Sequence, residues 1–170
     1  MHNKSYSKHY EQSVVVEASA DKVFAYVDDL RNFSSHMNQS SWMMGGGYMK
    51  TETDKGGGQK VGSHIRMKGK VFGINLFLDE VIIEHVPPFR KAWETVGVIN
   101  LLVIDHYKFG FKITTKEEKS LLKVHIDYNL PRTLVSNLLG RVFSGIYARW
   151  CVGQMVNGAQ KHFNPHRALS

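Results

Sequence analysis

The order of apolar and polar positions predicts a chain made mostly of strands and closed by one long helix, within residues 131–165. At about 100° per residue, the apolar residues of its second half share one face, as in an amphipathic helix: Ala148, Cys151, Val152, Met155, Val156, Ala159 and Phe163. The apolar residues of its first half share a face turned by about 130° from the other: Val135, Leu138, Leu139, Val142, Phe143, Ile146 and Trp150.

One straight helix cannot point both faces at one core. We expect a bend near Gly140 or Gly145, since glycine weakens a helix by about 1 kcal/mol relative to alanine. The first apolar stripe, Val135 to Trp150, would then meet the short helices or strand ends, or form a dimer or lipid contact. The sequence leaves these alternatives open.

Alternating apolar residues and turn signals predict strands before this helix. The ranges are Gln12–Ala18, Val61–Lys68, Ile74–Val86, Arg90–Gly97, Leu101–Thr115 and Leu122–Leu130. The charged residues on the outer faces of these strands predict a sheet with one wet side.

Two short helices are expected after the first strand. Ser19 is a candidate N-cap for a helix carrying Val23, Phe24 and Val27, and a second helix carries Leu30, Phe33 and Met37. The glycines at 45–47 suggest a bulge, and those at 56–58 a hairpin tip. Residues 1–11 are expected to be a loose lead-in.

This order predicts an α+β fold. A curved antiparallel sheet of about seven strands wraps around the long C-terminal helix, with two short helices after the first strand. The length of 170 residues fits a single domain over residues 1–170. Because one helix cannot fill the concave face of such a sheet, the architecture predicts a pocket between them.

Composition indicates the cellular compartment and the state of the cysteine. No apolar run is long enough to span a membrane, and the N-terminus lacks the apolar centre of a signal peptide, so a cytoplasmic protein is expected. Cys151 is the single cysteine, which excludes an intrachain disulfide and favours a buried, unreactive thiol.

The net charge of +7 favours an anionic partner. Arg66, Lys68 and Lys70 form a candidate basic hairpin for an anionic surface, although a solvated face that keeps the protein soluble explains them as well. No feature predicts sequence-specific nucleic-acid binding, and a homodimer stays open.

Two carboxylates are candidate acid/base groups. Asp105 has the same parity as Tyr107 and Phe109, and Asp79 lies between Phe77 and Val81. A carboxylate on an inner face must be paired, protonated or hydrated, and a raised pKa would suit catalysis. The alternative for Asp105 is a strand end that meets solvent.

Other chemistries find no support. No set of three metal ligands is evident, and there is no nucleophile elbow or phosphate-binding glycine loop, so neither a metal nor a cofactor is expected. His106 would point away from Asp105 in a regular strand, which argues against a dyad of these two residues.

Three stretches carry a family resemblance. They are Val14-Val15-Val16-Glu17-Ala18-Ser19-Ala20-Asp21-Lys22-Val23-Phe24, Val86-Pro87-Pro88-Phe89-Arg90 and the terminal helix. They resemble the START-like or Bet v 1-like helix-grip (SRPBCC) superfamily, in particular its bacterial polyketide cyclase/dehydrase and lipid transport proteins. The resemblance implies a ligand cavity more than a particular reaction, because the superfamily includes carriers, receptors and cyclases.

The expected function is therefore binding of a hydrophobic small molecule, such as a lipid, isoprenoid quinone or polyketide-like aromatic, by a carrier or binding protein. One alternative is a cyclase or dehydratase that uses Asp105 or Asp79, and the other is an interaction protein that docks through the basic hairpin. Aromatic, methionine and polar side chains are the candidate ligand contacts: Trp42, Met44, Met67, Trp93, Asp105, Tyr107, Phe109, Tyr128, Arg149 and Met155.

Overall fold

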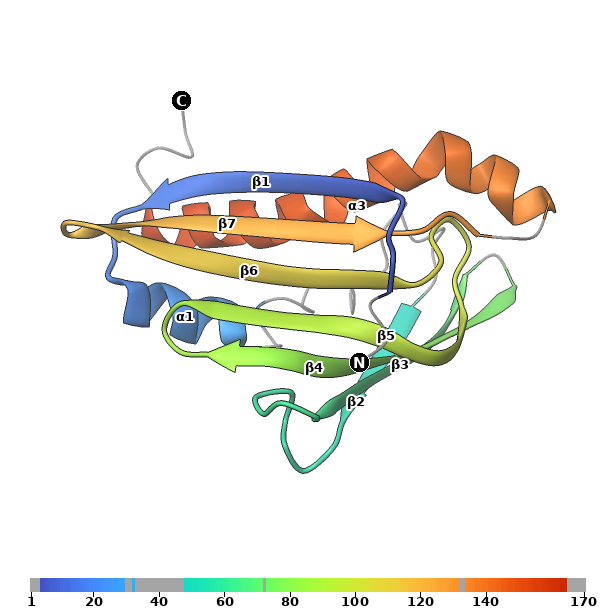
Figure 1. The fold of residues 1–170 in the computed structure, drawn as a ribbon, viewed down its shortest axis with the longest axis horizontal. Coiled ribbons are helices and arrows are strands. Elements are labelled where there is room, and N and C mark those ends of the chain that lie inside the picture. The colour runs from blue at the N-terminus through green and yellow to red at the C-terminus, as the bar shows by residue number, and fades with distance from the viewer. Residues whose placement is uncertain (1–3, 30–31, 33–47, 72, 132–133, 165–170) are drawn as a thin grey trace.

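A computed structural model describes residues 4–29, 32, 48–71, 73–131 and 134–164. Seven antiparallel strands form one curved sheet in the order β1-β7-β6-β5-β4-β3-β2 (Figure 1). The elements are β1 (Lys8–Val16), α1 (Ala20–Asp28), β2 (Tyr48–Thr53), β3 (His64–Val71), β4 (Ile74–Val86), β5 (Arg90–Asn100), β6 (Tyr107–Lys116), β7 (Lys119–Tyr128) and α3 (Leu134–Phe163). The predicted helix-grip fold is confirmed.

Strand alternation sets the inner face of the sheet. In β7 every second side chain is buried, and the same holds for the first part of β6. On β3, Ile65 and Met67 are buried while Arg66 and Lys68 are exposed, so the basic residues lie on the outer face as predicted. The inner faces form one apolar core with α1 and α3.

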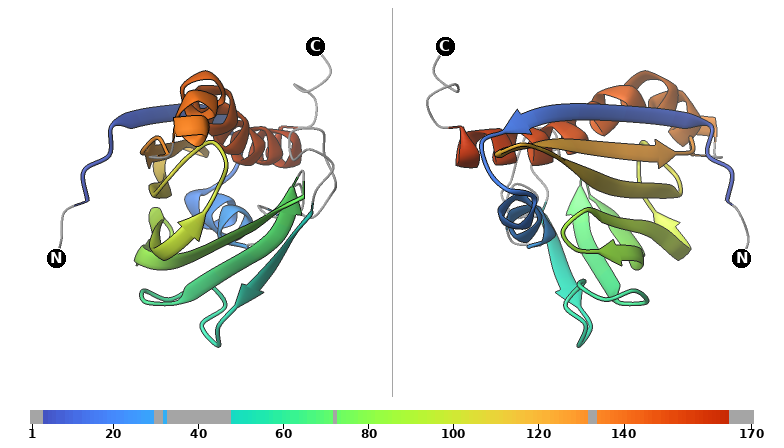
Figure 2. Two further views of the ribbon diagram at one scale, coloured as in Figure 1. Left: turned by 90° about the vertical axis from the view of Figure 1, so that its right-hand side faces the viewer. Right: turned by 60° about the vertical axis from the view of Figure 1, so that its left-hand side comes forward.

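Helix α3 packs against β1 and β7. Ala148, Val152 and Ala159 have no exposed surface there, and two of these three side chains are a single methyl group, which lets the helix lie close to the strands. Figure 2 shows the first and second parts of α3 running in different directions, as the two apolar stripes require. The predicted bend is therefore present.

Part of the first stripe is exposed. Val142, Phe143 and Ile146 expose 58%, 46% and 51% of their surfaces, whereas Trp150 packs against the core. Near the start of the helix, Gly140 lies against Pro131 and the carbonyl of Val103. Of the described stripe residues, three therefore form an outer surface and Trp150 meets the core, while the side chains of Val135, Leu138 and Leu139 lie outside the described part of the chain.

Of the predicted strands only Ile74–Val86 keeps both its bounds; the others shift at one or both ends, and two of these shifts matter most. Strand β1 starts at Lys8, because residues 8–11 pair with residues 125–128 of β7, so the expected loose lead-in was wrong for these four residues. The predicted strand Leu101–Thr115 was wrong in its first part, since β6 starts at Tyr107. Residues 101–106 form a connection in which the Asp105 amide donates to the Asn129 carbonyl at 2.8 Å. The apolar parity continued beyond the strand because Leu101 and Val103 of this connection also pack, partly buried, against the core.

The first short helix is confirmed as α1, and Ser19 occupies its N-cap position without a side-chain capping bond. The second short helix and the glycines at 45–47 lie outside the described residues. The hairpin tip at 56–58 is confirmed between β2 and β3, where Gly57 adopts a φ of +59°. Within the described part of the chain, no helix is both long and apolar enough to cross a membrane.

Candidate functional site

The interior beneath α3 contains a small cavity of about 30 Å³. Its wall combines side chains from β3 to β7, from the β5–β6 connection and from α3: Met67, Leu78, Glu80, Trp93, Leu101, Ile104, Tyr107, Phe109, Ile126, Tyr147 and Cys151. The volume has room for one or two water molecules. It lies where the fold predicts the ligand pocket, between the concave face of the sheet and the long helix.

One carboxylate lies in this largely apolar wall. Glu80 is 2% exposed and belongs to the inner face of β4, between Leu78 and Ile82. The Tyr107 hydroxyl, from β6, donates a hydrogen bond to Glu80 Oε1. Trp93, from β5, also bonds to this carboxylate. Three neighbouring strands therefore converge on one buried acidic group.

Burial changes the protonation of these groups. Desolvation raises the pKa of Glu80 from 4.5 to about 7, and the hydrogen bonds from Tyr107 and Trp93 oppose this shift without cancelling it. Burial, and then the nearby Glu80, raise the pKa of Tyr107 well above its usual value. Near neutral pH the pair can thus donate a hydrogen bond from the protonated Glu80 carboxyl or from the Tyr107 hydroxyl, or accept one at the ionised carboxylate.

Helix α3 contributes two weaker polar groups opposite the sheet. The side chains of Tyr147 and Cys151, four residues apart, are hydrogen-bonded to each other. Burial raises the pKa of the Cys151 thiol to about 12, so it is protonated at neutral pH and a poor nucleophile.

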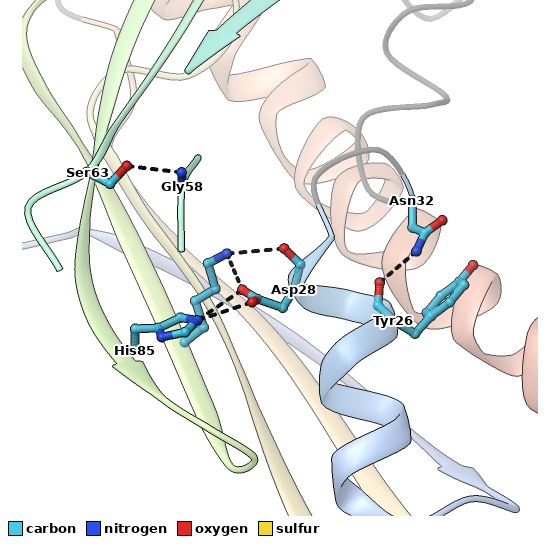
Figure 3. Close-up of polar contacts among 7 residues, drawn as sticks. Tyr26, Asp28, Asn32, Gly58, Ser63 and His85 are labelled. Atoms are coloured by element: carbon cyan, nitrogen blue, oxygen red, sulfur yellow. Dashed lines mark hydrogen bonds and ion pairs between the residues drawn. The ribbon is translucent and has the colours of Figure 1, made fainter. Parts of the chain in front are cut away.

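A second buried polar cluster anchors α1 to the sheet. Asp28, the last residue of α1, faces His85 of β4 at 3.2 Å (Figure 3). The ammonium of Lys91, whose side chain is 1% exposed, bonds to the Asp28 carboxylate and also donates to the Asp28 backbone carbonyl at 3.4 Å. Burial lowers the pKa of Lys91, and the carboxylate opposes that shift.

The geometry of this cluster indicates a structural role. A cation at the C-terminal end of a helix is stabilised by the carbonyl groups there, and Lys91 holds that position for α1. The Lys91 ammonium also lies 5.9 Å from the centre of the Trp93 ring, which links the cluster to the cavity wall. Lys91 itself does not line the cavity.

The structure brings four of the predicted contact residues together. Met67, Trp93, Tyr107 and Phe109 line the cavity. Three others lie elsewhere. Tyr128 is buried in the core, Met155 lines a separate space of about 10 Å³, and Arg149 is exposed with its guanidinium 5.8 Å from the Tyr10 ring. Trp42 and Met44 lie outside the described residues.

Neither predicted acid/base candidate lines the cavity. Asp79 is on the outer face of β4, where its carboxylate pairs with Arg66 at 3.2 Å and His64 at 2.8 Å. Asp105 lies in the β5–β6 connection with its side chain 21% exposed and 3.0 Å from the His106 ring. The argument against a contact between these two neighbours was wrong, since it assumed a regular strand.

Sequence reasoning missed Glu80 and Lys91. Glu80 alternates with Leu76, Leu78 and Ile82, and that parity was the available signal. The opposite parity contains Phe77 and Val81, which are just as apolar, so β4 offers two plausible inner faces. Lys91 has the same parity as Trp93 and Thr95, which was a signal that its side chain points inward. Only the position of Asp28 shows why a buried lysine is tolerated there.

The remaining sites are weaker candidates. A wider surface depression of about 320 Å³ lies by the β4–β5 turn, but it is open to solvent and the Arg90 guanidinium there pairs with Glu84 at 3.1 Å. Among the described residues, no group of three or more His, Cys, Asp or Glu side chains is placed to hold a metal ion.

Solved structures share this architecture over nearly their whole length. The protein TTHA0849 from Thermus thermophilus superimposes with a TM-score of 0.63 at 12% identity, covering 96% of this chain and 100% of its own. A norcoclaurine synthase point mutant from Thalictrum flavum, solved with a transition-state analogue, gives 0.64 at 16%, covering 97% and 99%. The ZhuI aromatase/cyclase from Streptomyces sp. R1128 gives 0.60 at 13%, covering 91% and 94%.

At these identities the structural matches establish the helix-grip fold alone. The sequence itself goes further, since a family model described as polyketide cyclase / dehydrase and lipid transport matches residues 7–159. The chain belongs to this family, as its sequence features indicated. A search of curated proteins found no match.

The buried carboxyl predicts a specific pH dependence of stability. Because the folded-state pKa of Glu80 lies above its unfolded value, the folded protein binds the proton more tightly, and its free energy of unfolding falls as pH rises from about 4.5 to about 7. The full loss is about 3 kcal/mol. In Glu80→Gln this pH-dependent loss should vanish. Urea unfolding should therefore show that the free energy of unfolding of the variant increases relative to that of the wild type as pH rises.

The matched control is Glu84→Gln, which removes a carboxylate from the same strand that is 40% exposed and paired with Arg90. It should leave the slope between about pH 4.5 and pH 7 unchanged. Identical pH profiles for the wild type and Glu80→Gln would contradict the assignment.

Proposed function

We propose that the chain binds a neutral, mostly apolar small molecule between the sheet and α3, as a carrier or binding protein. A lipid, an isoprenoid quinone or a polyketide-like aromatic would meet this description. The observation that carries the proposal is the hydrogen-bonded pair of Glu80 and Tyr107 in the wall of an otherwise largely apolar interior. The family description, which includes lipid transport, supports it.

The chemistry of the pair favours an oxygen-bearing ligand. A protonated Glu80 or the Tyr107 hydroxyl can donate to a carbonyl or hydroxyl oxygen in a medium where water does not compete. An anionic ligand would lose its hydration, and no cation among the described residues lines the cavity to compensate it. Trp93 and Phe109, stacked with ring centres 5.1 Å apart, offer a flat apolar surface for a ring.

Ligand entry requires the interior to widen, because about 30 Å³ holds no ring-sized molecule. Leu101 and Ile104 come from the β5–β6 connection, which packs against the first part of α3 near Gly140. We place the entrance there. Movement of this connection away from α3 would enlarge the cavity without breaking strand pairing.

The proposal is tested with two probes of similar shape. Menadione carries two ring carbonyls, and 2-methylnaphthalene carries none. Quenching of tryptophan fluorescence should show that the protein binds menadione more tightly by about tenfold, the value of one or two buried hydrogen bonds. The double variant Glu80→Leu/Tyr107→Phe should lose this preference, because both hydrogen-bonding groups are gone.

The control is Tyr128→Phe, which removes a buried hydroxyl outside the cavity and should keep the preference. Equal binding of the two probes by the wild-type protein would contradict the role of Glu80 and Tyr107. Failure to bind either probe, together with no ligand in native mass spectra of protein purified from its own host, would contradict ligand binding.

A second candidate function is a cyclase or dehydratase. Its support is the pKa of Glu80, which burial raises to about 7, where a carboxyl can both take up and release a proton at neutral pH. Glu80 replaces Asp105 and Asp79 as the acid/base group of this hypothesis, because neither aspartate lines the cavity.

With a ligand identified by native mass spectrometry, Glu80→Gln should abolish its conversion while leaving its binding within about threefold. Asp105→Asn and Asp79→Asn serve as controls and should convert the ligand at the wild-type rate. Conversion by Glu80→Gln at the wild-type rate would exclude this role.

A further inference from the structure

The first part of α3 presents an apolar surface to solvent beside the cavity. Ile146 follows Val142 by four residues and Phe143 by three, so the three side chains form one continuous patch, and about half of each residue's surface is exposed. We call these three residues the α3 patch. Directly next to Ile146 in sequence, Tyr147 lines the cavity from the other side of the same helix.

The charged side chains of α3 itself near the patch all have one sign. Arg141 and Arg149 are exposed; Arg149 lies three residues after Ile146 on the side of the patch, and Arg141 directly precedes Val142 at its edge. No acidic residue follows Asp127 in the sequence, so α3 contains no carboxylate at all. An apolar stripe flanked by arginines is the pattern of a helix that lies in the interface of an anionic membrane.

The basic hairpin expected from the sequence fits an anionic surface less well. Arg66 is held by Asp79, Lys50 pairs with Glu52, and Asp54 lies at the same end. Acidic partners therefore neutralise part of that charge. Among the hairpin's described side chains, the exposed large apolar ones, Val61 and Ile74, lie at its two ends rather than in one patch.

The charge pattern also argues against a second copy of the chain on the α3 patch. A two-fold contact between two α3 helices would bring the arginines of both copies together, and neither helix has a carboxylate to pair with them. Nucleic acid would be attracted by the arginines, but Val142, Phe143 and Ile146 offer it no hydrogen bonds.

We propose that the α3 patch, with Arg141 and Arg149, docks the protein on an anionic lipid surface. The apolar side chains enter the boundary between headgroups and acyl chains, and the guanidinium groups pair with lipid phosphates. The docking itself does not depend on what the interior binds.

Vesicle co-sedimentation tests the docking. The wild-type protein should bind vesicles of phosphatidylcholine mixed with phosphatidylglycerol, bind vesicles of phosphatidylcholine alone more weakly, and be released by salt. The triple variant Val142→Ser/Phe143→Ser/Ile146→Ser should bind the anionic vesicles at least about tenfold more weakly. Arg141→Gln/Arg149→Gln should bind the anionic vesicles about fivefold more weakly for each charge removed, and its binding should depend much less on salt.

The matched controls lie at the opposite end of the sheet. Val61→Ser/Val86→Ser/Phe89→Ser removes three side chains that are 64%, 39% and 46% exposed, and Lys112→Gln/Lys116→Gln removes two exposed charges. Both should bind as the wild type does. No vesicle binding by the wild type, or equal losses in the controls, would overturn the proposal.

A fluorescent label reports the orientation directly. In a Cys151→Ala background, an environment-sensitive probe attached at Phe143→Cys should brighten and shift to the blue on anionic vesicles, while the same probe at Phe89→Cys, a position of equal 46% exposure, should not. A patch-dependent dimer in sedimentation velocity, without a vesicle-induced shift at position 143, would assign the patch to a second copy and overturn the membrane role.

Discussion

The packing of α3 against β1 and β7 is the contact on which the rest of the structure depends. Ala148, Val152 and Ala159 bring the helix close to one side of the curved sheet. The inner faces of β3, β4 and β5 curve away from this contact, so the space between them and the helix must be filled by other side chains. The cavity lies in that space, and its polar group, Glu80, is on the central strand of the three.

The same contact explains why α3 has two tasks. Its second half is fixed by the strands and closes the core. Its first half lies on the other side of a bend and runs beyond the strands (Figure 2). There one side of the helix, at Gly140, contacts Pro131 and Val103, and the other side is exposed. The cavity wall residue Tyr147 and the exposed Ile146 are adjacent, so the proposed binding interior and the proposed membrane surface share one segment of helix.

Much of this fold could be predicted from the sequence because alternation and helical periodicity are local signals. The strand Ile74–Val86 was predicted with the same two ends that it has in the structure, and the two stripes of α3 predicted its bend. The candidate site was harder. Which face of β4 points inward depends on its neighbours, and both faces are apolar, so Asp79 was chosen and Glu80 was missed.

The errors about Asp105 and Lys91 have the same cause. Asp105 has the parity of an inner residue, but the chain leaves the strand before it, and the hydrogen bond to Asn129 that ends the regular pairing joins residues distant in sequence. The Lys91–Asp28 pair likewise joins α1 to β5, and no local pattern announces it. Burial of a charged group is decided by the partner that meets it, and the partner is known only when the chain is folded.

The central claim is that Glu80 is a buried, functional carboxyl in contact with the ligand. Its titration can be followed directly by NMR through the side-chain carboxyl carbon, in the free protein and with menadione bound. The account predicts a pKa near 7 in the free protein, as desolvation requires, and a further rise when a neutral carbonyl accepts a hydrogen bond from the protonated form. A pKa near 4.5 that does not change with menadione would contradict it.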